Sequence, residues 1–142
     1  MPKMTIEEFN KLLADEMPFA VDAGLRLEEI QHGEATMVLP YDGSMLRPGG
    51  TISGPSMMML ADAAMYAVVL SMIGPVALAV TTNFNINFLR KPVPGDITAE
   101  GKIIKLGKRL AVIQVTLFSV NDEEPVAHST GTYSIPPLEK RS

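Results

Sequence analysis

The chain has 142 residues, of which 46% are hydrophobic and 20% are charged, a composition typical of a folded globular protein. It contains no cysteine, which excludes disulfide bonds, thiolate metal sites and a cysteine nucleophile. Twelve basic and sixteen acidic residues give a net charge of −4, which does not favour a nucleic-acid partner, because such a partner requires a basic face.

The N-terminal residues 1–19 predict one helix followed by a turn. Thr5 stands three positions before Glu8, and this pairing is a capping box that begins a helix. The helix is expected to run to about Glu16, and Met17-Pro18-Phe19 ends it. Its apolar face would carry Phe9, Leu12 and Leu13. The N-terminus has no apolar signal-peptide stretch, so we expect a cytoplasmic protein.

From Gly24 the apolar residues alternate with polar ones, which is the pattern of half-buried strands. The alternation breaks at residues 31–34, and this break predicts a hairpin with His32 exposed in its turn. The inward-facing residues would be Leu25, Leu27, Ile30, Ala35, Met37 and Leu39.

Residues 41–54 are rich in Gly, Ser and Pro, so they predict a loop whose backbone can approach a ligand closely. Pro55 suits the first position of a helix, since it has no N–H to lose. The helix predicted over 55–73 is apolar around nearly its whole circumference and must be covered on all sides. Asp62 and the break at 74–75 make it a poor membrane span, so we expect no membrane partner.

Four strand-like runs follow the long helix, and polar turns separate them. They are residues 77–90, 97–106, 109–120 and 125–135. One antiparallel sheet wrapped around one long central helix satisfies this order of elements. The sequence therefore predicts an α+β protein in the hot-dog arrangement, with residues 1–142 in a single domain.

Asp62 stands inside the most apolar helix of the chain, where an unpaired carboxylate is costly to bury. It is either a structural acid bonded to a nearby group or a catalytic acid. Gly54 lies at the amino end of the same helix, where free N–H groups can hold a carbonyl oxygen as it becomes negative. Eight residues, or about 12 Å, separate the two positions. This separation suggests a site shared between two subunits.

The stretch RPGGTISGPSMMMLADAAMYA, residues 47–67, resembles the signature of hot-dog acyl-CoA thioesterases of the phenylacetate-degradation (PaaI-like) type. That signature reads approximately Asn-x-x-Gly-x-x-His-Gly-Gly, then a small apolar run, then Leu-Ala-Asp. Leu60-Ala61-Asp62 matches it outright, and Gly50 and Gly54 fall on its glycines. The stretches LAVTTNFNINFLRKPVPGD and GKRLAVIQVTLFSVNDEEPVAHSTGTYSI resemble the family's later strands, so the resemblance covers about residues 20–136.

The resemblance implies hydrolysis of an acyl-CoA thioester to a free acid and CoA. Asp62 would be the general base that activates water, or the nucleophile itself. The Gly54 N–H would polarise the thioester carbonyl, and Thr81 or Thr82 would position the water or the acid. CoA would enter only as part of the substrate, so no cofactor and no metal are expected.

Pro55 falls on the second of the paired glycines, and two polar positions depart from the signature, because Arg47 replaces its Asn and Ser53 replaces its His. Arg47 could clamp a carboxylated acyl group or Asp62 itself. Met57 or Met58 could line an acyl tunnel. The departures leave open whether activity is retained, redirected or lost.

The phosphates of CoA require cations at the mouth of the site. Arg90 is the first candidate, because the resemblance places it beside the nucleotide groove, and Lys91 follows it. Other candidates on the next predicted hairpin are Lys102, Lys105, Lys108 and Arg109.

Three functions remain open. The first is the thioesterase. The second is a non-catalytic protein that binds acyl-CoA or another small ligand, favoured by Ser53 and Arg47. The third is hydration of an enoyl-CoA, against which the loop 41–54 counts because it has no His. A sheet curled around one helix leaves open edges, so we expect a homodimer or homotetramer.

Overall fold

The structure is a computed structural model that describes residues 1–16, 18, 24–40, 46–47, 51–52, 54–75, 79–93, 95–120 and 122–137. In chain order its elements are α1 (Ile6–Glu16), β1 (Arg26–Gln31), β2 (Glu34–Leu39), β3 (Leu46–Arg47), β4 (Thr51–Ile52), α3 (Gly54–Ile73), β5 (Val80–Phe88), β6 (Ile97–Leu106), β7 (Leu110–Ser119) and β8 (Pro125–Ser134).

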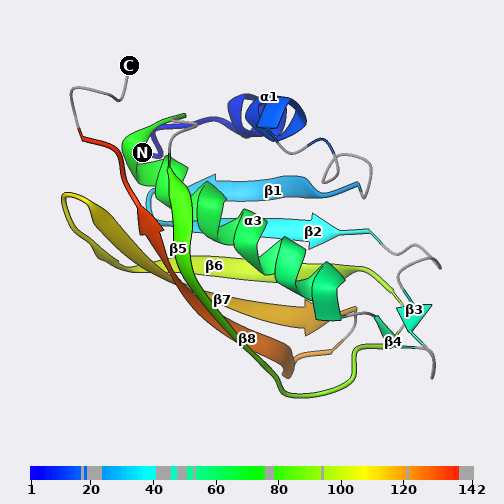
Figure 1. Ribbon diagram of the computed structural model, residues 1–142. Coiled ribbons are helices and arrows are strands. Elements are labelled where there is room, and N and C mark those ends of the chain that lie inside the picture. The colour runs from blue at the N-terminus through cyan, green and yellow to red at the C-terminus, as the bar shows by residue number, and fades with distance from the viewer. Residues whose placement is uncertain are drawn as a thin grey trace.

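Six of the strands form one antiparallel sheet in the order β1-β2-β6-β7-β8-β5. Figure 1 shows α3 lying across one face of this sheet, with α1 beyond the β1 edge. Strands β3 and β4 form a separate two-stranded ladder. The predicted arrangement, an antiparallel sheet wrapped around one long helix, is confirmed.

Close packing of α3 on the sheet depends on small residues at the contact. The buried face of α3 includes four alanines, and Gly101 on β6 and Gly131 on β8 lie beneath the helix. A Cβ atom on Gly101 would lie 2.8 Å from Cγ2 of Val68, and one on Gly131 would lie 2.6 Å from Sδ of Met65. Both glycines therefore let the helix approach the strands closely.

Helix α3 is long and apolar enough to cross a membrane, but 67% of its most apolar window is buried inside the fold. The sheet covers most of the helix surface, as the all-round apolar pattern requires. This burial is what the sequence predicted for a core helix.

Helix α1 begins with the predicted capping box. The Thr5 N–H donates to Oε1 of Glu8 at 2.9 Å, and the Glu8 N–H donates to Oγ1 of Thr5 at 3.1 Å. Phe9 and Leu13 are buried, and the ring of Phe9 lies 5.9 Å from the ring of Tyr66 on α3. These apolar contacts hold α1 against the central helix.

The hairpin β1–β2 places the predicted alternating residues inward, with one irregularity. A register shift between Leu27 and Glu29 inserts an extra residue, so Leu27 and Ile30 pack on the same core although three positions separate them. The exposed His32 lies in the turn, as predicted.

Strand β5 is shorter than the predicted run 77–90. It begins at Val80, and residues 77 and 78 lie outside the described part of the chain. It ends at Phe88 because the N–H groups of Leu89 and Arg90 both donate to the carbonyl of Val126, which turns the chain away from the ladder. The other three predicted strands are confirmed to within one residue at each end.

The contact between Gly101 and Val68 gives a test of the helix–sheet packing. We expect Gly101→Val to lower the free energy of unfolding by about 1–3 kcal/mol, because a β-branched side chain would overpack a rigid contact. Urea denaturation measures the effect. The matched control is Lys102→Ala at the next position, whose side chain is exposed. A change above about 0.5 kcal/mol in its free energy of unfolding would contradict this explanation.

Candidate active site

Asp62 lies on the flank of α3 that faces the start of β5, and its side chain is half-buried rather than enclosed. Oγ1 of Thr81 donates to Oδ1 of Asp62 at 2.8 Å. The phenol of Tyr133 lies 2.8 Å from the same Oδ1 and 3.0 Å from the backbone carbonyl oxygen of Asp62, so its single proton serves both acceptors. The carboxylate is therefore held by two side-chain donors on one of its oxygens.

The ladder between β5 and β8 brings the two donors together. Thr81 is the direct partner of Tyr133 across these strands. A register shift between Thr81 and Asn83 then displaces Thr82, whose Oγ1 donates to the carbonyl of Thr132 at 3.2 Å instead. Of the two predicted threonines, the structure therefore brings Thr81 to Asp62 and leaves Thr82 apart from it.

Tyr133 remains a hydrogen-bond donor over the whole physiological pH range. Burial of its ring raises the pKa of the phenol, and the negative charge of Asp62 raises that pKa further. The ring of Tyr133 stacks on that of Tyr66, with centroids 6.1 Å apart. Burial, together with the charge of Glu16, raises the pKa of Tyr66 to about 12. Both phenols are therefore protonated at neutral pH.

The asymmetric anchoring leaves the second carboxylate oxygen free to react. Both side-chain hydrogen bonds reach Oδ1 of Asp62, and Oδ2 accepts none from the described residues. A carboxylate held in this way can take a proton from water through Oδ2, or attack an electrophilic carbon with it.

A pocket of about 210 Å³ opens beside this carboxylate. The described residues that line it are Glu16, Asp62, Tyr66, Ala79, Val80, Thr81 and Tyr133. A larger hollow of about 270 Å³ lies over β2, β6 and β7, but none of the candidate catalytic residues lines it. The pocket beside Asp62 is therefore the candidate active site.

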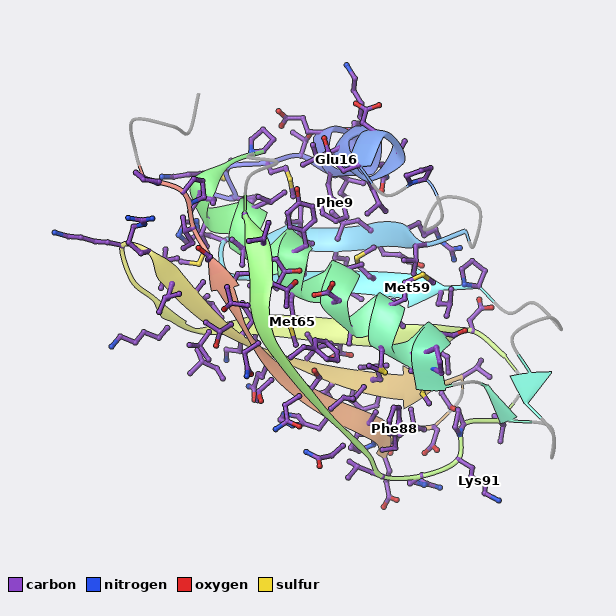
Figure 2. The ribbon with its side chains drawn as sticks, viewed as in Figure 1. Phe9, Glu16, Met59, Met65, Phe88 and Lys91 are labelled. Carbon is purple, nitrogen blue, oxygen red and sulfur yellow. The ribbon has the colours of Figure 1, made fainter. Side chains whose placement is uncertain are left out.

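Gly54 is the first residue of α3, and it lies beside Phe88, the last residue of β5. Cζ of Phe88 lies 3.3 Å from the position that a Cβ atom on Gly54 would occupy, and Figure 2 shows Phe88 beside this end of the helix. The amino end of α3 therefore neighbours the end of β5, whereas Asp62 neighbours its beginning.

The remaining acyl-binding candidates lie partly outside the described structure. Ser53 and the side chain of Arg47 are not among the described residues. Met57 is buried in the core and does not line the pocket, while Met58 is 40% exposed.

The predicted phosphate ligands follow the end of β5. The guanidinium of Arg90 forms ion pairs with Asp122 at 3.2 Å and Glu124 at 2.9 Å, so its charge is already partly offset. Lys91 is exposed at the far end of β5 from the pocket (Figure 2). Within one subunit, neither cation lies beside Asp62.

Tyr133, Tyr66 and Glu16 are pocket residues that the sequence did not identify. One signal was available for Tyr133. It follows Ala127, Ser129 and Gly131 at inward positions of β8, and a phenol in such a row requires a buried partner. The described residues contain no group of three His, Asp or Glu side chains that could hold a metal ion.

Comparisons with known proteins show the family to which this chain is related. The model of the thioesterase superfamily matches residues 49–126, more than half of the chain. The crystal structure of a protein assigned as a thioesterase from Silicibacter sp. TM1040 is 42% identical, with a TM-score of 0.86 and coverage of 96% of this chain and 95% of that one. A protein assigned as an esterase in Thermoplasma acidophilum is 30% identical, covering 82% of this chain and 91% of its own length.

The Escherichia coli PaaI protein from the phenylacetic acid degradation operon is also similar in structure. Its TM-score is 0.75 at 21% identity, over 91% of this chain and 96% of that one. At this identity the likeness shows a shared fold. The hot-dog fold predicted from the sequence is confirmed by these neighbours.

The hydrogen bonds to Asp62 make a prediction about stability. We expect Tyr133→Phe to lower the free energy of unfolding by about 1.5–3 kcal/mol, because it removes a buried donor to a charged group. The same substitution should cost much less in an Asp62→Ala background. Chemical denaturation of the four proteins in this cycle gives the coupling.

Tyr66→Phe is the matched control, because the Tyr66 hydroxyl makes no side-chain hydrogen bond among the described residues. Equal costs for Tyr133→Phe with and without the Asp62 carboxylate would show that the phenol is not bound to it.

Proposed function

This chain belongs to the thioesterase superfamily, and we propose that it hydrolyses an acyl-CoA thioester to a free acid and CoA. The observation that carries the proposal is the Asp62 carboxylate, anchored through Oδ1 by Thr81 and Tyr133 at the wall of a pocket. CoA enters as part of the substrate, and the reaction that we propose uses no cofactor.

Asp62 acts in one of two ways in this proposal. As a general base, Oδ2 takes a proton from water while the water oxygen attacks the thioester carbon; the C–S bond then breaks and the CoA thiolate takes up a proton. As a nucleophile, Oδ2 attacks that carbon directly, the C–S bond breaks and CoA leaves as its thiolate, which takes up a proton. Water then hydrolyses the resulting mixed anhydride to the free acid and the Asp62 carboxylate. Thr81 keeps the carboxylate oriented in both cases.

The carbonyl oxygen becomes negative during either attack and requires a donor. We propose the N–H of Gly54 at the amino end of α3, where the helix dipole adds to the effect. Within one subunit this group lies about 12 Å along the helix from Asp62, since eight residues separate them. A second copy of the chain would have to supply it.

Strand β5 offers the geometry for such a pairing. Among the strands that the structure describes it is an edge strand of the sheet, and such an edge is a template for another strand. Antiparallel pairing of two β5 strands about their midpoints would set Phe88 of the partner subunit opposite Val80. Since Gly54 packs on Phe88 and Asp62 binds Thr81, the two halves of the site would meet across this interface.

The same pairing supports the proposed phosphate ligands. Arg90 and Lys91 follow Phe88, so those of one subunit would lie near the pocket of the other. Lys91 is exposed and available to a phosphate, while Arg90 would exchange one of its carboxylate partners. Arg47 and Ser53 stay proposed substrate contacts. We propose a cytoplasmic homodimer or homotetramer with no nucleic-acid or membrane partner.

One alternative function is favoured by a specific observation. Ser53 and Arg47 replace the His and Asn of the resembled signature, which would suit a protein that binds acyl-CoA without hydrolysing it. Tight binding of several CoA esters with no release of thiol from any of them would favour this alternative.

Thiol release from a panel of acyl-CoA esters tests the proposed hydrolysis. We expect Asp62→Asn to lower kcat by at least about a hundredfold, because it removes the base or nucleophile while keeping the side-chain shape. Glu100→Gln, an exposed carboxylate on β6, is the matched control and should leave turnover unchanged. Full activity in Asp62→Asn would exclude the proposed role of this residue.

A mixing experiment tests the shared site. Gly54→Pro removes the proposed N–H donor, and we expect it to reduce kcat by about 10²–10³ on its own. When the Gly54→Pro and Asp62→Asn chains are co-expressed, we expect the mixture to have about a quarter of wild-type activity. Half of the dimers then contain one chain of each kind, and each of these mixed dimers has one intact site out of two. Circular dichroism checks that both variants fold. No recovery would place both groups in a single subunit.

A further inference from the structure

A second carboxylate enters the pocket from a distant part of the chain. Glu16, the last residue of α1, lines the pocket together with Asp62. Figure 2 shows Glu16 at the end of α1, above α3 and the start of β5. Glu16 precedes the residues 49–126 that the superfamily model matches, so this wall of the pocket is contributed by a segment outside that match.

The position of Glu16 is fixed by the packing of its helix. Phe9, Leu13 and Glu16 are spaced four and three residues apart, so they share one face of α1. The first two are buried against the core, and Phe9 contacts the ring of Tyr66. The capping box at Thr5 and Glu8 secures the other end of the helix. Glu16 is therefore carried to the pocket by a well-anchored element.

The charge of Glu16 reaches the interior of the pocket. It contributes, after burial, to the raised pKa of Tyr66, whose ring forms part of the wall. The described lining contains two carboxylates and no Lys, Arg or His side chain. The described lining beside the reactive carboxylate is therefore negatively charged.

This charge decides which end of the substrate the pocket holds. The phosphates of CoA carry negative charge and would be repelled by Glu16 and Asp62. Lys91 and Arg90, the proposed phosphate ligands, lie at the opposite end of β5 from Val80 and Thr81. The acyl group is the part of the substrate that suits this space.

We propose that Glu16 determines acyl-group specificity, so that the pocket takes uncharged acyl groups and rejects those that end in a carboxylate. The inference rests on the proposed thioester hydrolysis and adds the substrate class. It runs against the clamping of a carboxylated acyl group by Arg47, which the sequence alone had suggested.

Butanoyl-CoA and succinyl-CoA provide the matched pair of substrates, because both acyl chains have four carbons and only the second ends in a carboxylate. The measured quantity is the ratio of kcat/KM for the two esters. We expect the wild-type protein to favour butanoyl-CoA, and Glu16→Gln to narrow the ratio by about three- to tenfold, since Glu16 is exposed and solvent screens part of its charge.

Asp15→Asn is the matched control. Asp15 is the neighbouring exposed carboxylate on α1 and does not line the pocket, so the same change in net charge should leave the ratio unaltered. The inference would be overturned if the kcat/KM ratio narrowed equally in both variants, or if it did not narrow in Glu16→Gln. Thiol release from butanoyl-CoA in the same experiment would still support the proposed hydrolysis.

A binding measurement separates the two proposals if no thiol is released. Dissociation constants are measured by calorimetry for stable analogues of both esters, in which a methylene group lies between the carbonyl carbon and the sulfur. We expect wild type and Asp15→Asn to bind the succinyl analogue more weakly than the butanoyl analogue, and Glu16→Gln to bind the two more equally. This result would support the role of Glu16 even without turnover. Equal binding of both analogues to wild type and Glu16→Gln would reject it.

Discussion

The architecture depends on one constraint, which is the need to cover a twenty-residue helix that is apolar on all sides. A single sheet can enclose most of such a helix only by curving around it, and small residues at the contacts let the strands come close. Gly101 and Gly131 serve this purpose beneath α3. The sheet does not close completely, and Asp62 occupies the flank that it leaves open. The only acidic residue of the helix therefore lies where solvent and substrate can reach it.

The burial of the groups around Asp62 also follows from this enclosure. Strand β8 lies inside the sheet between β5 and β7, and the side chain of Tyr133 packs on Tyr66 of α3, so the phenol is buried and stays protonated. Thr81 stands on the edge strand and is exposed. A rigid donor from the interior and a more accessible donor from the edge thus hold the same carboxylate oxygen. Both donors are on Oδ1, so Oδ2 accepts no side-chain hydrogen bond from the described residues.

Local rules were sufficient to predict much of the fold. The capping box at Thr5, the hairpin turn around His32 and the long helix after Pro55 each depend on neighbouring residues, and each was found close to its predicted position. The site required contacts between distant segments. The pairing of Thr81 with Tyr133 spans about fifty residues, and the approach of Glu16 to Asp62 depends on how α1 packs. No local pattern contains that information.

The choice between Thr81 and Thr82 illustrates the same limit. Both residues have the same chemistry and the same strand propensity, so the sequence could not separate them. The register shift after Thr81 decides the matter, and such irregularities arise from the whole β5–β8 ladder rather than from the two residues themselves.

That shift also has a consequence for how the site can change. Side chains on a strand alternate between faces, so gaining or losing one residue near Thr82 would re-phase the rest of β5 in a single step. The residues presented toward a neighbouring subunit would be exchanged for those on the opposite face, while α3 and its carboxylate stayed in place. Length changes at this point would therefore alter assembly and substrate contacts together, and point substitutions would alter them one at a time.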